Sequence, residues 1–111
     1  MIRPSFFPKS SEKIHNVILN DRLKHLEEDT VKWASEQMIK VLAKNRKKGG
    51  WRHCTFDYLR SKLFEEWMEL LDAIEKYQKD KRTKPTAIKE AIDVMNIAMM
   101  IADLIQNDKG V

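Results

Sequence analysis

One stretch near the end of the chain constrains the fold more than any other. After Asp93 the sequence reads Val-Met-Asn-Ile-Ala-Met-Met-Ile-Ala-Asp-Leu-Ile. If this stretch is helical, apolar side chains cover nearly its whole circumference, and such a helix is buried on most sides. A chain of 111 residues with three helices cannot easily wrap one of them. The sequence therefore predicts a bundle that further copies of the chain complete, as a homodimer or homotetramer.

Helices are favoured over strands along the whole chain. There are only 3 Gly and 3 Pro, and 42% hydrophobic with 34% charged residues exclude a wholly disordered chain. Apolar residues that recur every three to five positions predict helices over about residues 12–47, 56–80 and 85–107. Gly49 and Gly50 are expected to end the first helix, Thr55 to cap the second, and Pro85 to lie in the first turn of the third.

These elements predict an all-α fold, a helical bundle with three to four main helices per chain. Residues 1–11, which hold two prolines and several serines, are expected to form an extended arm, and residues 12–111 a single domain. No run of 18 apolar residues occurs, so we expect no membrane span. Cys54 is the single cysteine, which fits the reducing cytoplasm.

Positive charge is gathered in two clusters. The first comprises Lys44, Arg46, Lys47, Lys48 and Arg52, and the second comprises Lys79, Lys81, Arg82 and Lys84. Clusters of this kind are usually solvated helix ends. The alternative is the attraction of a polyphosphate or a nucleic acid.

Acidic residues border the apolar faces of the second and third predicted helices. Glu66 and Glu69 lie one turn apart beside one apolar stripe, whereas Glu65 points further toward solvent. Glu90 and Asp93 repeat the spacing at the head of the third helix. Two antiparallel helices joined by a short loop would bring the two pairs face to face.

Carboxylates that converge in this way repel one another, and burying them without a positive partner is costly. Oxygen ligands suit Mg²⁺, with Mn²⁺ as a substitute, better than Zn²⁺. No histidine stands at the Glu-x-x-His spacing that a di-iron bundle site uses. The alternative is that both pairs are solvated helix charges, and the spacing alone leaves this alternative open.

Residues 62–70, KLFEEWMEL, followed by residues 90–96, EAIDVMN, resemble the signature of the MazG-like all-α nucleoside triphosphate pyrophosphohydrolases. Residues 91–103 are especially similar to small phage or bacterial members, and the resemblance covers about residues 45–105. It implies a helical bundle built across a dimer or tetramer. It also implies that Mg²⁺ is bound by Glu66, Glu69, Glu90 and Asp93.

The resemblance further implies a reaction. An NTP or dNTP would be cleaved between its α and β phosphates, giving the monophosphate and pyrophosphate, with housecleaning of the nucleotide pool as the role. Bound metal lowers the pKa of a water molecule, and a carboxylate that the metal does not saturate can take its proton. We expect Glu69 in that catalytic role.

Other residues are candidates for binding the substrate, each with a structural alternative. Lys62, one turn before the first acid of the motif, could reach a phosphate or form a salt bridge to that acid. Asn96 could contact the nucleotide or make an interhelical hydrogen bond. Trp51 could stack on a base, as an aromatic does there in some members of the family, or anchor its loop. Lys48 and Arg52 flank the proposed site and could meet the triphosphate.

A non-catalytic helical protein that binds nucleic acid or nucleotide is the competing hypothesis. It would use the two basic clusters, and a steep salt dependence of binding would support it. The chain lacks aromatics interleaved with these clusters and any known recognition-helix motif, so a nucleic acid is the less favoured partner.

Overall fold

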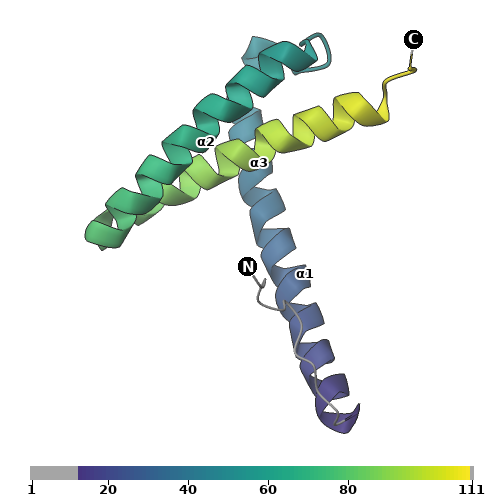
Figure 1. Cartoon of the computed structure of the whole chain (residues 1–111), viewed down its shortest axis with the longest axis vertical. Helices are drawn as coiled ribbons and strands as arrows, with labels where there is room; N and C mark the ends of the chain where they lie inside the picture. Colours follow the sequence, from purple (N-terminus) through teal and green to yellow (C-terminus); the bar gives the residue numbers. More distant parts are fainter. Residues whose placement is uncertain (1–12, 111) are drawn as a thin grey trace, which may run out of the picture. The chain divides into compact units, whose positions relative to one another are not determined.

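A computed structural model describes the backbone of residues 13–110 and the side chains of residues 16–110. This part of the chain is helical and contains no strand, which confirms the predicted all-α class. Its α-helices are α1 (Lys13–Lys44), α2 (Phe56–Lys79) and α3 (Lys84–Gln106), with single 3-10 turns η1 (Arg46–Lys48) and η2 (Lys81–Thr83) between them (Figure 1). The predicted N-terminal arm, residues 1–11, lies outside the described residues.

The chain divides into two compact units, Met1–Trp33 and Ala34–Val111. The second unit holds α2, α3 and the last turns of α1, and it contains every candidate site residue. That residues 12–111 form a single domain stays a prediction.

Local signals decide where the helices of the second unit begin and end. The Thr55 hydroxyl accepts a hydrogen bond from the Tyr58 backbone N–H at 3.1 Å, so Thr55 caps α2 as predicted. Pro85 lies in the first turn of α3, also as predicted. The α-helical part of α1 ends at Lys44, short of the predicted residue 47, because the chain tightens into η1. Gly49 then stops η1 with a left-handed φ of 93°.

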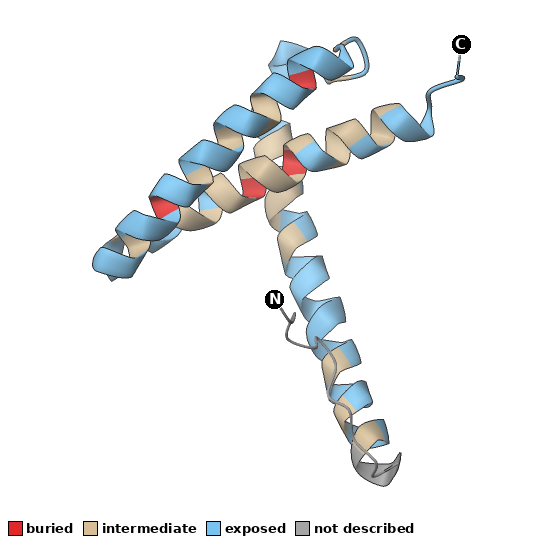
Figure 2. Ribbon diagram, viewed as in Figure 1, coloured by how far each residue is buried: buried red, intermediate tan, exposed pale blue. Residues whose placement is uncertain are grey.

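The fully buried core of the second unit is small. Among the described residues, the buried apolar side chains are Leu59 and Ala73 of α2 and Ile92 of α3, with exposed fractions of 2%, 5% and 2% (Figure 2). α2 and α3 pack against one another as an antiparallel hairpin. Asn96 of α3 is buried with them, at 3%.

Within the part of the chain that the structure describes, α3 is less buried than its sequence predicts. Its apolar residues after Asp93 are mostly half-buried, and Ile105 is 60% exposed. Among the described residues, the burial on most sides that the sequence requires is therefore not reached, and the predicted oligomer stays a prediction. None of the helices among the described residues carries an apolar stretch that would reach across a bilayer.

Candidate metal centre

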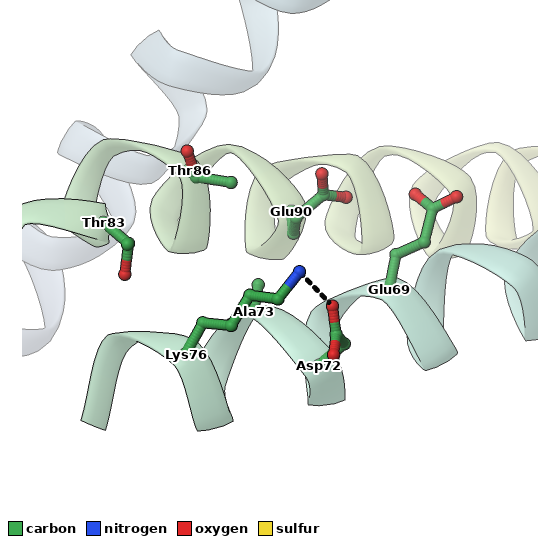
Figure 3. Close-up of a pocket in the computed structure, with 7 residues that line it drawn as sticks. All are labelled: Glu69, Asp72, Ala73, Lys76, Thr83, Thr86 and Glu90. Atoms are coloured by element: carbon green, nitrogen blue, oxygen red, sulfur yellow. Dashed lines mark ion pairs between the residues drawn. The ribbon is translucent and has the colours of Figure 1, made fainter. Parts of the chain in front are cut away.

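The hairpin of α2 and α3 brings three of the predicted metal ligands together. Glu66, Glu69 and Glu90 each offer one carboxylate oxygen, and these three atoms lie within 4.8 Å of one another. In Figure 3 the Glu69 side chain extends from α2 toward α3, where Glu90 lies. The i, i+3 spacing puts Glu66 and Glu69 on one side of α2, and the antiparallel packing supplies Glu90 from the opposite helix.

Glu66 and Glu90 are the less exposed members of the cluster. Their side chains are only 13% and 14% exposed. One oxygen of each, Oε2, is shielded from solvent and has no hydrogen-bond partner. Buried polar atoms are nearly always paired, so two unsatisfied carboxylate oxygens in one cluster need an explanation.

The electrostatics of the cluster disfavour the ionised carboxylates. Burial is the largest cause of the raised pKa of Glu66, and the neighbouring charges of Glu69 and Asp93 add to it. Burial also raises the pKa of Glu90, although the adjacent Lys89 ammonium opposes the rise. A positive charge placed among these oxygens would reverse both effects.

Two lysines neutralise part of the negative charge. Lys62 Nζ lies 3.4 Å from Glu65 Oε2 and 3.8 Å from Glu66 Oε1, so the salt bridge that competes with a phosphate-binding role is present. Lys89 Nζ lies 3.6 Å from Glu90 Oε1. The sequence reasoning missed Lys89, although it directly precedes Glu90. Neither lysine reaches the two buried Oε2 atoms.

Asp93, the fourth predicted ligand, stands beside the cluster and is not part of it. Its Oδ2 pairs with Lys89 Nζ at 2.9 Å. Its charge nevertheless raises the pKa of both Glu66 and Glu90, so it belongs to the same electrostatic site. Glu65 is confirmed as an outward charge, with a side chain that is 62% exposed.

The residues present fit a hard divalent cation. All members of the cluster are oxygen donors, which Mg²⁺ and Mn²⁺ prefer. The shielded Oε2 atoms of Glu66 and Glu90 supply ligand atoms that no protein group satisfies. Exposed acidic groups often cluster without a metal, but these two atoms are not exposed.

An open cleft of about 340 Å³ adjoins the cluster between α2 and α3. Glu69 and Glu90 line the end of the cleft that belongs to the cluster, and Asp72, Ala73, Lys76, Thr83 and Thr86 line the remainder (Figure 3). Lys76 Nζ pairs with Asp72 Oδ2 at 2.9 Å. The sequence analysis did not single out these polar residues. The position of Lys76 two helical turns after Glu69 was the available signal.

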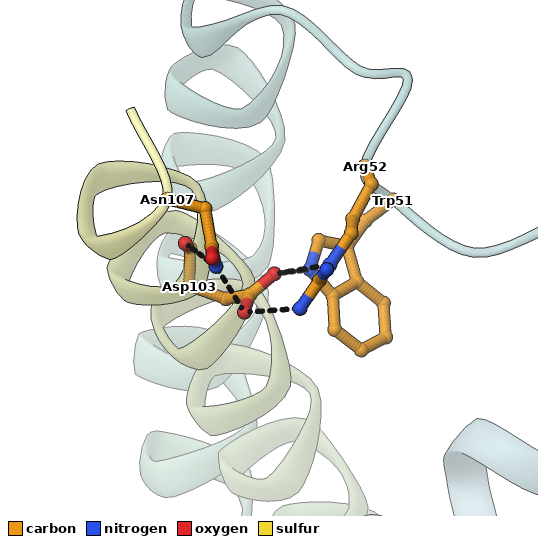
Figure 4. A network of polar contacts seen from close by, with 4 residues as sticks. All are labelled: Trp51, Arg52, Asp103 and Asn107. Atoms are coloured by element: carbon orange, nitrogen blue, oxygen red, sulfur yellow. Dashed lines mark hydrogen bonds and ion pairs between the residues drawn. The ribbon is translucent and has the colours of Figure 1, made fainter. Parts of the chain in front are cut away.

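The loop residues Trp51 and Arg52 are held by another carboxylate. Trp51 donates its indole N–H to Asp103 Oδ2 at 2.8 Å, and Arg52 donates to both oxygens of Asp103 at 3.1 and 3.0 Å (Figure 4). Asn107, the C-cap residue of α3, completes the network by donating to Asp103 Oδ1 at 3.0 Å. Asp103 follows Asp93 by ten residues, about 15 Å along the helix axis. The loop-anchor interpretation of Trp51 therefore matches this arrangement, and neither loop residue joins the carboxylate cluster.

The last two substrate-binding candidates lie elsewhere. Asn96 donates from Nδ2 to the Met38 carbonyl of α1 at 3.4 Å, which is the interhelical hydrogen bond of the structural alternative. Its Oδ1 is buried without a partner. Lys48 is exposed in η1.

No family model, curated protein or solved structure matches the chain.

Proposed function

We propose that the chain is a Mg²⁺-dependent nucleoside triphosphate pyrophosphohydrolase that cleaves between the α and β phosphates. The observation that supports this function is the convergence of Glu66, Glu69 and Glu90 around two shielded, unpartnered oxygens. The adjoining cleft supports it as well, because it leaves room for a ligand beside the carboxylates. The resemblance of residues 62–70 and 90–96 to the MazG-like signature selects this reaction among those that metal–carboxylate sites perform.

The three glutamates would have different tasks. Glu66 and Glu90, the two less exposed members, would hold the metal, with Asp93 supplying further negative charge after release from Lys89. Bound Mg²⁺ would offset the phosphate charge and lower the pKa of a water molecule. Glu69 is the exposed member of the cluster and also lines the cleft. It would accept a proton from that water.

The cleft residues would complete the binding of the substrate. Lys76 and Thr86 offer an ammonium group and a hydroxyl to phosphate oxygens. The Thr83 hydroxyl already donates to the Asp80 carbonyl at 2.9 Å, so it is the weaker candidate. Lys62 would lie on the other side of Glu66, where it balances charge when no metal is bound.

A turnover panel tests the proposal. The purified chain is incubated with each NTP and dNTP, with Mg²⁺ or with EDTA, and the products are separated by anion exchange. Monophosphate plus pyrophosphate, lost with EDTA, is the expected result. Diphosphate plus orthophosphate would retain the metal site but reject the cleavage position. No turnover with any nucleotide, combined with salt-sensitive retention on DNA or RNA, would favour the non-catalytic alternative.

A matched pair of substitutions ties the activity to the cluster. Glu66→Gln should reduce kcat/KM by at least about 100-fold, because it removes a charged ligand and leaves the shape unchanged. Glu65→Gln, one residue earlier on the exposed side of α2, should change it by less than about threefold. Equal losses in the two variants would mean that the active carboxylates have been misassigned.

A further inference from the structure

Lys89 of α3 contacts two of the four predicted metal ligands at once. Its Nζ lies 2.9 Å from Asp93 Oδ2, within hydrogen-bond distance, and 3.6 Å from Glu90 Oε1. Asp93 is the predicted ligand that stands outside the carboxylate cluster. The other oxygen of Glu90, Oε2, is shielded and has no partner. The ammonium group therefore pairs with one oxygen of each carboxylate and leaves the shielded Glu90 oxygen unsatisfied.

Lys62 of α2 is not equivalent to Lys89. It contacts one predicted ligand, Glu66, at 3.8 Å. Its shorter contact, 3.4 Å, is to Glu65, the outward charge. Lys62 therefore balances charge at the margin of the cluster, whereas Lys89 holds a predicted ligand away from it.

The pair of Lys89 and Asp93 is suited to exchange. The lysine side chain is 62% exposed, so water would solvate the ammonium group after its release. The Asp93 side chain is only 17% exposed and would stay beside the cluster. Pairs four residues apart on a helix are more stabilising when the acid comes first, and here the base comes first. A divalent cation attracts a carboxylate more strongly than a single ammonium charge does, so it can displace Lys89.

We propose that Lys89 and the divalent metal compete for Asp93. This inference rests on the proposed function, because it takes the carboxylate cluster to be the metal site. Without the metal, Lys89 keeps Asp93 out of the cluster and offsets part of the negative charge. When the metal binds, Asp93 leaves the ammonium group and joins the other carboxylates. Lys89 is thus a positioning residue that lowers the affinity of the chain for the metal without being a ligand.

Electron paramagnetic resonance of free Mn²⁺ measures this affinity without nucleotide or turnover. Lys89→Gln should lower the Kd for Mn²⁺ by about tenfold, because a like charge is removed from beside the ion and Asp93 is released. Lys89→Arg keeps the charge, so it should bind Mn²⁺ no more tightly than the wild type does. Circular dichroism of each variant in EDTA verifies that the helical fold is unchanged.

Lys79→Gln is the matched control for the loss of one lysine charge. Lys79 also belongs to a pair four residues apart, with its Nζ 3.1 Å from Glu75 Oε1. It follows Glu69 by ten residues, about 15 Å along the axis of α2, where salt screens its charge from the cluster. Its Kd for Mn²⁺ should stay within about twofold of the wild-type value.

The same substitution in an Asp93→Asn background separates competition for Asp93 from a general effect of charge. Asp93→Asn alone should bind Mn²⁺ more weakly than the wild type. Adding Lys89→Gln should then lower the Kd by less than about threefold, since the carboxylate that Lys89 holds is absent. An equal gain in both backgrounds, or a Lys89→Arg variant as tight as Lys89→Gln, would overturn the competition.

Two further outcomes separate this inference from the proposed function. If the wild type binds Mn²⁺ and Lys89→Gln binds it with the same Kd, the role of Lys89 is rejected and the metal site is retained. If neither the wild type nor Lys89→Gln binds Mn²⁺, the metal site itself is rejected, and the role of Lys89 with it.

Discussion

Glu66 on α2 and Glu90 on α3 each hold one carboxylate oxygen that is shielded from solvent and unpaired. Their oxygens and one from Glu69 converge within 4.8 Å. Each carboxylate is destabilised chiefly by its own burial and further by its acidic neighbours. The convergence of these carboxylates therefore lowers the stability of the metal-free fold. Such local destabilisation is common where a site is arranged to bind a ligand.

Neutralising Glu66 should stabilise the metal-free chain. A raised pKa means that the folded state binds the proton more tightly than the unfolded state. The free energy of unfolding therefore falls as the pH rises through the ordinary carboxyl range to the raised pKa of Glu66, and it stays low above that pH. In EDTA at pH 7, Glu66→Gln should raise Tm on the order of a few degrees.

The same comparison of Tm between Glu66→Gln and the wild type at acid pH tests the direction of this pH dependence. Below the ordinary carboxyl pKa, Glu66 is protonated in both states, so the Tm advantage of Glu66→Gln should disappear. Glu65→Gln is the control, because this side chain is exposed and its pairing with Lys62 contributes little. A lower Tm for Glu66→Gln than for wild type in EDTA at pH 7 would mean that Glu66 is already satisfied without a metal.

Mg²⁺ should stabilise the folded chain, because a ligand that binds only the folded state raises the free energy of unfolding. At a free concentration of 100 times Kd the gain is about 2.7 kcal/mol. Thermal unfolding with increasing Mg²⁺ measures it, with NaCl at matched ionic strength as the reference. Glu90→Gln should lose most of the gain, since it removes one of the buried oxygen donors. An equal response to Mg²⁺ and NaCl would show only charge screening.

The helix boundaries could be predicted because their signals are local. Thr55 accepts from a backbone N–H three residues later, and Pro85 suits the first turn of a helix in any context. The pairing of Glu66 with Glu69 follows from helical periodicity alone. Glu90 joins them because the short connection at η2 forces α2 and α3 to run antiparallel.

Contacts between distant residues could not be predicted in this way. Trp51 and Asp103 are separated by 52 positions, and nothing near either residue indicates the other. The cleft residues Lys76 and Thr86 meet only through the register of the hairpin. Asp93 was expected in the cluster because it follows Glu90 by three residues. It also follows Lys89 by four residues, and one of its oxygens pairs with that lysine instead.

Replacing Asn96 with leucine should distinguish its two interpretations. Asn96 is 3% exposed, has a 3.4 Å hydrogen bond to Met38 and leaves Oδ1 unpaired, so its net contribution to stability is small. We expect Asn96→Leu to change the free energy of unfolding by less than about 1 kcal/mol. KM should be unchanged if a substrate is turned over. A large rise in KM with normal stability would instead assign Asn96 to the substrate.

Asp103 should hold the Trp51–Arg52 loop in place. Trp51 and Arg52 donate hydrogen bonds that lower the pKa of Asp103, so the stabilising contribution is present above the ordinary carboxyl pKa of an aspartate. It is lost as the pH falls through the lowered pKa. Asp103→Asn removes the charge and one acceptor, so the Trp51 indole N–H should exchange with solvent about tenfold faster at pH 7.

Nuclear magnetic resonance of the indole protons measures this exchange, with Asp108→Asn as a control on an exposed acid beyond the end of α3. The increase should vanish at strongly acid pH, where Asp103 itself is protonated. If Trp51 and Arg52 only anchor their loop, kcat/KM should remain within about threefold of wild type. A loss of 100-fold or more would require the loop to reach the substrate, despite the distance of about 15 Å that separates Asp103 from Asp93 along α3.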